Sequence, residues 1–137
     1  MMTIDEMQDV LNELAEELPE VFFKDLNGGI VLLPGAKESE YSQEKDLYTL
    51  GEYHHGGNMG SYIKIYYGSF ERLFGHLSDE QMKIRLRKTL RHEFRHHIET
   101  LAGEKGLVVE DAKFIRSYLE KRNPVRGRKK IRKTDPQ

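Results

Sequence analysis

Two histidines and a glutamate stand at a spacing that suits a metal ion and its chemistry. Residues 91–99 read Arg-His-Glu-Phe-Arg-His-His-Ile-Glu, so His92, Glu93 and His96 form the pattern His-Glu-x-x-His. On a helix, a separation of four residues rotates a side chain by only about 40°, which places His92 and His96 one above the other. Glu93 is rotated by about 100° from His92, close enough to hydrogen-bond a water on a shared ion without being its ligand.

These three side chains provide the two metal ligands and the proton acceptor that zinc-dependent hydrolysis requires. Two neutral imidazoles hold Zn²⁺, the ion lowers the pKa of its water toward about 7, and the carboxylate takes the proton. The chain has no cysteine, so any metal must be held by imidazole and carboxylate groups. We therefore expect a zinc-dependent hydrolase with His92 and His96 as ligands and Glu93 as general base. The alternative is a charged, solvated helix face shared with Arg91 and Arg95.

A long helix is predicted to carry the motif. Ser78 and Gln81 form a capping box at its start, and Gly103 supplies its end. Six apolar residues fall in an arc roughly opposite the two histidines: Met82, Leu86, Leu90, Phe94, Ile98 and Leu101. One side of the helix should therefore pack into the core while the other side lines a cleft.

The remaining elements follow from apolar periodicity and turn residues. We expect helices over 4–18, 19–26 and 109–119, strands over 30–33, 47–53 and 61–67, and a loop over 34–46. In the last strand Ile63 and Ile65 share one face and Tyr62 and Lys64 the other, an alternation typical of a half-exposed or edge strand. His54 and His55 lie in the Gly-rich segment between the second and third strands, where exposed loop positions are favoured over a place in a cleft.

Length and charge predict one domain, residues 1–122, and a basic tail, residues 123–137. A chain of 137 residues suits one domain with a core. Residues 121–137 hold eight Lys and Arg against one Asp, which leaves a charge of −8 on residues 1–120 because the whole chain carries −1. The absence of cysteine, of a signal peptide and of a long apolar stretch favours a cytoplasmic protein that makes no membrane contact.

The chain also resembles the minimal zincin-like metallopeptidases of bacteria, whose motif reads His-Glu-x-x-His-His-x-Gly-x-x-Asp. The similarity runs roughly from Thr3 to Glu120. Beside the histidine motif it is carried by Glu17-Leu18-Pro19-Glu20, Leu50-Gly51-Glu52-Tyr53, Ile63-Lys64-Ile65-Tyr66-Tyr67-Gly68-Ser69-Phe70-Glu71-Arg72 and Arg87-Lys88-Thr89-Leu90-Arg91-His92-Glu93. The resemblance implies an α+β, zincin-like fold in which a small mixed sheet packs against the active-site helix, with helices at both ends of the domain.

It further implies a peptide or protein substrate, bound as an extra strand beside residues 61–67. Such binding uses backbone hydrogen bonds and tolerates many sequences. His92 and His96 match the ligands of the family, Glu93 its base and His97 its second consecutive histidine.

The third zinc ligand departs from the family pattern. Ala102 stands where the family has its aspartate, and Glu99 where it has glycine, whereas Glu110 and Asp111 resemble the acidic segment of the family shifted downstream. The Cα of Glu99 lies about 10 Å along the helix axis from that of His92, which hinders convergence on one ion. We therefore favour Asp111 over Glu110 as third ligand, with Glu99 as a partner that orients an imidazole.

A competing interpretation rests on the basic tail. It is a non-catalytic protein that keeps the metal for stability and whose residues 123–137 bind nucleic acid or the ribosome. The tail contains no aromatic residue, so it would act as an electrostatic anchor of weak affinity, and a solubilising terminus would look the same.

Overall fold

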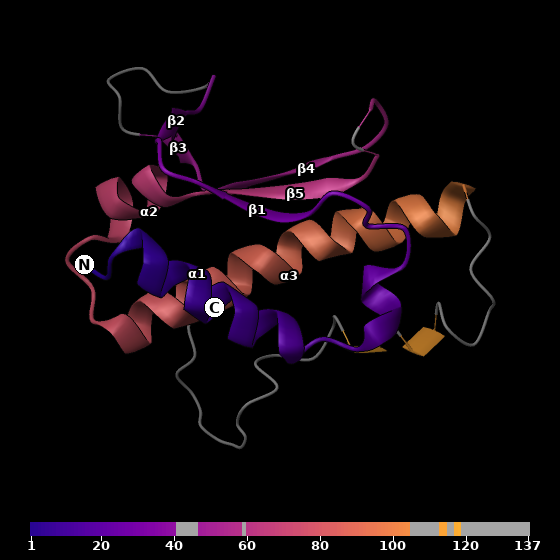
Figure 1. The fold of residues 1–137 in the computed structure, drawn as a ribbon, viewed down its shortest axis with the longest axis horizontal. Helices are drawn as coiled ribbons and strands as arrows, with labels where there is room; N and C mark the ends of the chain where they lie inside the picture. The colour runs from indigo at the N-terminus through magenta and orange to yellow at the C-terminus, as the bar shows by residue number, and fades with distance from the viewer. Residues whose placement is uncertain (41–46, 59, 105–112, 115–116, 119–137) are drawn as a thin grey trace. The chain divides into compact units, whose positions relative to one another are not determined.

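The computed structural model describes residues 1–40, 47–58 and 60–104, together with the helical residues 113–114 and 117–118 (Figure 1). The chain forms two compact units, Met1–His97 and Ile98–Gln137. The elements below lie in the first unit, except for the end of the last helix. The predicted tail and the predicted domain boundary at residue 122 lie outside the described residues.

The described elements are four helices and five strands. The helices are α1 (Ile4–Glu16), the 3₁₀ helix η1 (Glu20–Phe23), α2 (Tyr67–Phe74) and α3 (Asp79–Glu104). The strands are β1 (Gly29–Leu33), β2 (Lys37–Glu38), β3 (Tyr48–Thr49), β4 (Gly51–His54) and β5 (Tyr62–Tyr66). None of these helices combines the length and apolar composition that crossing a membrane requires.

The main sheet has three strands in the order β1-β5-β4. β1 runs parallel to β5, with Ile30 opposite Ile63, and β4 runs antiparallel to β5, with Tyr53 opposite Ile63. The predicted α+β class with a small mixed sheet is confirmed. Of the two alternatives for residues 61–67, the half-exposed strand is confirmed, because Tyr62 and Lys64 are half-buried and alternate with buried isoleucines. The edge strand is wrong, because β5 lies in the centre and β4 is an edge. Alternation reports which faces of a strand are covered, and it carries no information about its two edges.

The core of the first unit lies on one side of this sheet. Ile63 and Ile65 of β5 are fully buried, and α1 and the first turns of α3 lie on the same side of the sheet (Figure 1). Met82, Leu86, Leu90 and Phe94 of the predicted apolar arc of α3 are buried in this unit. The other two residues of the arc, Ile98 and Leu101, are also buried and belong to the second unit. Arg87 of α3 donates two hydrogen bonds of 2.9 Å to the Glu17 carboxylate at the end of α1, which fixes the pairing of the two helices.

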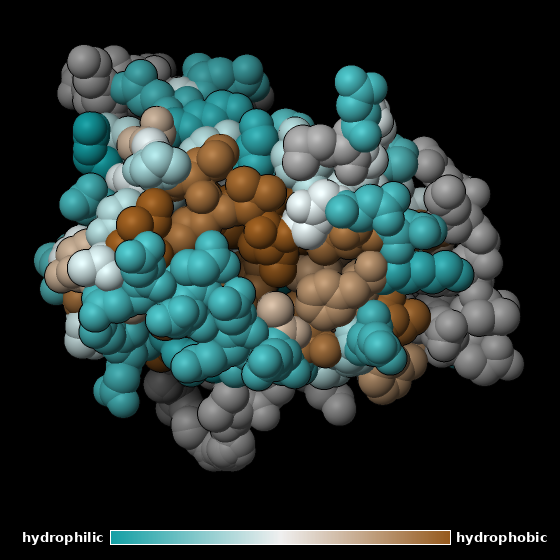
Figure 2. All heavy atoms as spheres, in the orientation of Figure 1, coloured by the Kyte–Doolittle hydropathy of each residue, from teal (hydrophilic) through white to brown (hydrophobic). Residues whose placement is uncertain are grey.

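Both predicted capping boxes are present. Thr3 and Glu6 bond reciprocally at the start of α1, and Ser78 and Gln81 do so at the start of α3. Because these signals are local, the structure reproduces the beginning of each helix as predicted. The other edge strand, β1, contains only Gly, Ile, Val and Leu, and its residues are half-buried. Figure 2 accordingly shows apolar side chains gathered over β1 on this face.

Four segments differ from the expectations. Residues 19–26 form the short η1 in place of a longer helix, the predicted loop contains the two-residue β2, and the predicted strand 47–53 is divided into β3 and β4. The helix α2 was not predicted at all. It follows β5 without a break, and its N-cap, Tyr66, makes no capping hydrogen bond through its side chain. The sequence therefore offered no start signal for this helix.

Gly68 at the start of α2 allows a close backbone contact. Its N–H donates to the carbonyl of Gly35 over 3.0 Å, and a Cβ at position 68 would lie 2.6 Å from backbone atoms of Gly35 and Ala36. We expect Gly68→Ala to lower the free energy of unfolding by about 1–3 kcal/mol, measured by urea denaturation. Gly35→Ala is the matched control, because its Cβ would meet nothing within 4 Å, and a change within about 0.5 kcal/mol is expected. Equal losses in the two variants would contradict this account.

Candidate active site

A cavity of about 580 Å³, here called the β4–α3 cavity, adjoins the histidine motif. It is lined by Gly51, Glu52, Tyr53 and His54 of β4 and by His92, Glu93 and His96 of α3. Four consecutive residues of one strand can line a cavity only along the backbone edge of that strand. Since the other edge of β4 is paired with β5, the cavity follows the edge that faces away from the sheet. Its volume is within the range of small-molecule and peptide sites.

His92 and His96 lie side by side in the lining of this cavity. Their Nε2 atoms are 3.3 Å apart and their rings are perpendicular, with centroids 4.8 Å apart. Both side chains are accessible to solvent. Two nitrogens that lie about 2.0–2.1 Å from one tetrahedral zinc ion are themselves about 3.3 Å apart. The separation of the two nitrogens thus matches that of two ligands of one tetrahedral zinc ion.

Glu93 lies in a different environment from the two histidines beside it. Glu93 is only 7% exposed, and it lines the cavity. Burial raises the pKa of Glu93 above its ordinary value, the charge of Glu52 acts in the same direction, and His96 and His54 oppose the shift. A buried carboxylate argues against the alternative of a uniformly solvated helix face.

The predicted third ligand is not among the residues that the structure describes. Asp111 and Glu110 both fall in the segment 105–112, and Glu99 is an exposed residue of α3. Within the described part of the chain, no group of three or more His, Asp and Glu side chains is arranged to hold a metal ion. The structure therefore brings two of the three predicted ligands together, and Asp111 stays a prediction.

His97 is buried and hydrogen-bonded at both ring nitrogens. Its Nε2 lies 2.7 Å from the carbonyl oxygen of Lys24, and its Nδ1 lies 2.8 Å from the hydroxyl of Tyr53. A carbonyl only accepts, so Nε2 carries the proton. Burial lowers the pKa of His97, although the bond to Lys24 opposes this shift, and the ring is neutral. Nδ1 must then accept the hydrogen bond of Tyr53.

This assignment gives direction to a chain of hydrogen bonds. The hydroxyl of Tyr53 has one hydrogen, which goes to His97, so it must accept from Ser61, whose Oγ lies 3.1 Å away. Ser61 in turn lies 3.1 Å from Nδ1 of His55 and accepts from it. The chain links the β4–β5 connection to the buried side of α3 and joins both walls of the β4–α3 cavity through Tyr53 and His97.

Gly51 permits the close approach that this link requires. A Cβ at position 51 would lie 3.0 Å from Cγ2 of Thr89 on α3 and 3.2 Å from Cδ1 of Ile65. A larger residue would push the start of β4 away from the helix. Gly51 and Tyr53 therefore act together, since the first allows the strand to approach and the second holds it there.

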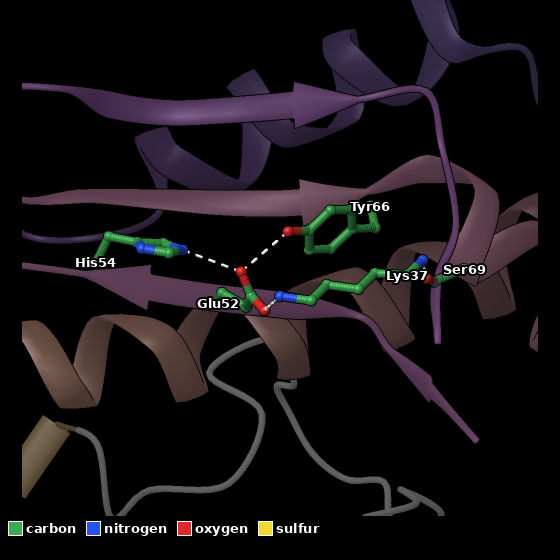
Figure 3. Close-up of polar contacts among 5 residues, drawn as sticks. All are labelled: Lys37, Glu52, His54, Tyr66 and Ser69. Carbon is green, nitrogen blue, oxygen red and sulfur yellow. Dashed lines mark hydrogen bonds and ion pairs between the residues drawn. The ribbon is translucent and has the colours of Figure 1, made fainter. Parts of the chain in front are cut away.

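Glu52 organises the opposite face of β4. Figure 3 shows Lys37, His54 and Tyr66 converging on its carboxylate from β2, β4 and β5. Tyr66 donates to Oε1 over 2.9 Å, Nε2 of His54 lies 2.9 Å from the same oxygen, and Lys37 forms an ion pair with Oε2. Ser69 accepts from the backbone N–H of Lys37 over 2.9 Å, which ties the cluster to α2.

The hydrogen bonds around Glu52 shift the pKa values of Glu52 and Tyr66. Burial alone would raise the pKa of Glu52, but the hydrogen bonds from Lys37, His54 and Tyr66 outweigh it and lower the pKa to about 2. Burial and the hydrogen bond to Glu52 raise the pKa of Tyr66 to about 12. Glu52 is therefore ionised and Tyr66 protonated over the whole neutral range.

Sequence reasoning found the α3 wall of the cavity and missed the β4 wall. The interpretation of His54 as an exposed loop residue is wrong, because it ends β4 and lines the cavity, whereas His55 is exposed as predicted. Glu52 and Tyr53 were recognised only as part of a resemblance. No spacing in the sequence relates them to α3, since their distance from the motif is set by the sheet.

Comparison with known proteins places the chain in a family without naming an activity. No family model and no curated protein matches it. A solved structure, a conserved hypothetical protein from Thermus thermophilus, is 33% identical to this chain, with a TM-score of 0.65 over 74% of this chain and 98% of that one. The chain belongs to the same family as that protein.

Tyr53→Phe tests the link between β4 and α3. It removes the hydrogen that Nδ1 of His97 accepts and leaves a buried acceptor unsatisfied, which should lower the free energy of unfolding by about 1–3 kcal/mol. Tyr48→Phe is the control, because the hydroxyl of Tyr48 accepts an exposed hydrogen bond from Arg72, and its loss should cost less than about 0.5 kcal/mol. Urea denaturation measures both, and a Tyr53→Phe protein as stable as Tyr48→Phe would refute the assigned role.

The pKa of Glu52 predicts a pH dependence of stability. Folding lowers this pKa from 4.5 to about 2, so the charged carboxylate stabilises the fold fully above pH 4.5, and the contribution is lost as the pH falls toward 2. The wild-type protein should therefore exceed Glu52→Gln in unfolding free energy by a constant amount at neutral pH. That difference should shrink in acid, where protonated Glu and Gln become alike. A difference that does not change with pH would contradict the predicted ionisation.

Proposed function

We propose that this protein is a zinc-dependent hydrolase of zincin type that cleaves peptide bonds. The observation that carries the proposal is the 3.3 Å separation of the Nε2 atoms of His92 and His96, both of which line the β4–α3 cavity. Two imidazoles so close that only one proton fits between them are well placed to share a cation instead.

His92 and His96 would hold the zinc ion, with Asp111 as the predicted third ligand. Imidazole and carboxylate groups suit zinc, and the chain offers no thiolate. When bound, zinc supplies a Lewis acid that polarises a carbonyl and lowers the pKa of a coordinated water toward about 7.

Glu93 would move the proton. Its carboxylate is buried against the cavity that His92 and His96 also line, where it can accept a proton from a water and return it to the amine that leaves. Burial also strengthens the electrostatic interaction of the carboxylate with groups in the cavity.

β4 would hold the peptide. The family resemblance implied this role for residues 61–67, but those residues form the central strand, and the edge strand beside the motif is β4. An extended peptide could hydrogen-bond to the outer edge of β4 and so pass in front of the two histidines. Strand addition recognises mainly the backbone of the substrate.

The competing interpretation, a metal-stabilised protein whose tail binds nucleic acid or the ribosome, stays a prediction. Its evidence is the charge of residues 121–137, which lie outside the described residues.

Metal analysis and peptide cleavage together test the proposal. The purified protein should contain about one zinc ion per chain, and His96→Ala should weaken zinc binding by more than about 100-fold in a chelator competition. Glu93→Gln should keep the zinc while lowering kcat by about 10²–10⁴-fold on an unstructured protein substrate, because only the proton acceptor is lost.

His76→Ala serves as the control, since His76 is an exposed histidine that does not line the cavity. It should change neither zinc content nor cleavage. Retention of zinc by His96→Ala would exclude the metal site, and full activity of Glu93→Gln would exclude the general base.

A further inference from the structure

The ring of His54 is held on two sides and open on a third. Its Nε2 edge is bonded to Glu52, and one of its faces stacks on the ring of Tyr62 at 4.9 Å with an angle of 10° between the planes. The side chain is 37% exposed and lines the β4–α3 cavity. Since Tyr62 lies across on β5, the second face of the imidazole is directed toward the outer edge of β4.

The pairing of β4 with β5 determines how a peptide would meet this edge. Tyr66 donates its backbone N–H to the carbonyl of Leu50, so these two residues form a hydrogen-bonded pair. In an antiparallel ladder such pairs alternate with non-hydrogen-bonded pairs. His54 and Tyr62 are therefore also a hydrogen-bonded pair, whereas the backbone groups of Gly51 and Tyr53 point away from β5 toward the cavity.

A peptide that binds Gly51 and Tyr53 as an antiparallel strand would place another residue directly opposite His54. This position is a non-hydrogen-bonded one, where Cα atoms approach to about 4.5 Å and side chains are closest. The side chain of that residue lies on the same face of the sheet as His54 and extends the row that begins with Tyr62. An aromatic ring there would continue the stack across three strands.

We propose that His54 forms a subsite for an aromatic side chain of the peptide, and this inference rests on the proposed function. Glu52 does not choose the substrate by its charge, because its oxygens are already bonded to Lys37, His54 and Tyr66. Its role is to fix the plane of the His54 ring. The subsite is thus a flat, pre-positioned surface and not a charged pocket.

Sequencing of cleavage products tests the subsite. A library of peptides from a digested proteome is incubated with the zinc-loaded protein, and the products are identified by mass spectrometry. Phe, Tyr, Trp and His should be enriched by about two- to fivefold at one fixed distance from the cleaved bond, as expected for one cross-strand aromatic pair. His54→Ala should remove this enrichment, and His54→Phe should retain it because the ring remains.

The controls separate this inference from the proposed function. His76→Ala should show the same enrichment as the wild-type protein. Cleavage by the wild-type protein without aromatic enrichment, or enrichment that survives in His54→Ala, would overturn the subsite while leaving the peptidase intact. If the wild-type protein cleaves no more than Glu93→Gln does, the proposed function fails, and the subsite with it.

Discussion

One partly buried hydrogen bond, from the hydroxyl of Tyr53 to Nδ1 of His97, joins the edge strand to the helix that carries the histidine motif. The two residues are 44 positions apart in the sequence, and the width of the β4–α3 cavity depends on how closely their elements approach. Because His97 is fully buried, its Nδ1 cannot exchange this bond for one to water while the helix stays in place. The link therefore holds the two walls at one distance.

The two consecutive histidines have opposite roles for a geometric reason. Successive residues of a helix are rotated by about 100°, so His96 and His97 cannot both face the cavity. His96 is exposed beside His92, whereas His97 is fully buried and bonded through both nitrogens. His97 thus anchors the buried side of α3, opposite the side that faces the cavity, to Tyr53 and Lys24. Phenylalanine there would fill the space but would leave both Tyr53 and the carbonyl of Lys24 without this partner.

Local signals in the sequence predicted the α3 wall, and non-local contacts made the rest unpredictable. The capping box at Ser78 and the apolar arc from Met82 to Leu101 fix the start and the rotation of α3 from adjacent residues alone. Strand order depends on which segments pair in space. Alternation suggested an edge position for residues 61–67, but they form the central strand β5, and β4 is at the edge. His54 was misjudged for the same reason: its burial is set by Tyr62 on another strand and by Glu52.

The candidate site also shows why identical residue types acquire different properties. Glu52 and Glu93 line the same cavity, yet the pKa of Glu52 is lowered to about 2 and that of Glu93 is raised. Three donors surround Glu52 and stabilise its charge, whereas burial dominates at Glu93. In the proposed function Glu93 must accept and release a proton, which its raised pKa favours, whereas Glu52 must stay charged to position the ring of His54. The charge of Glu52 also raises the pKa of Glu93, so the residue that orients His54 favours proton uptake by its neighbour.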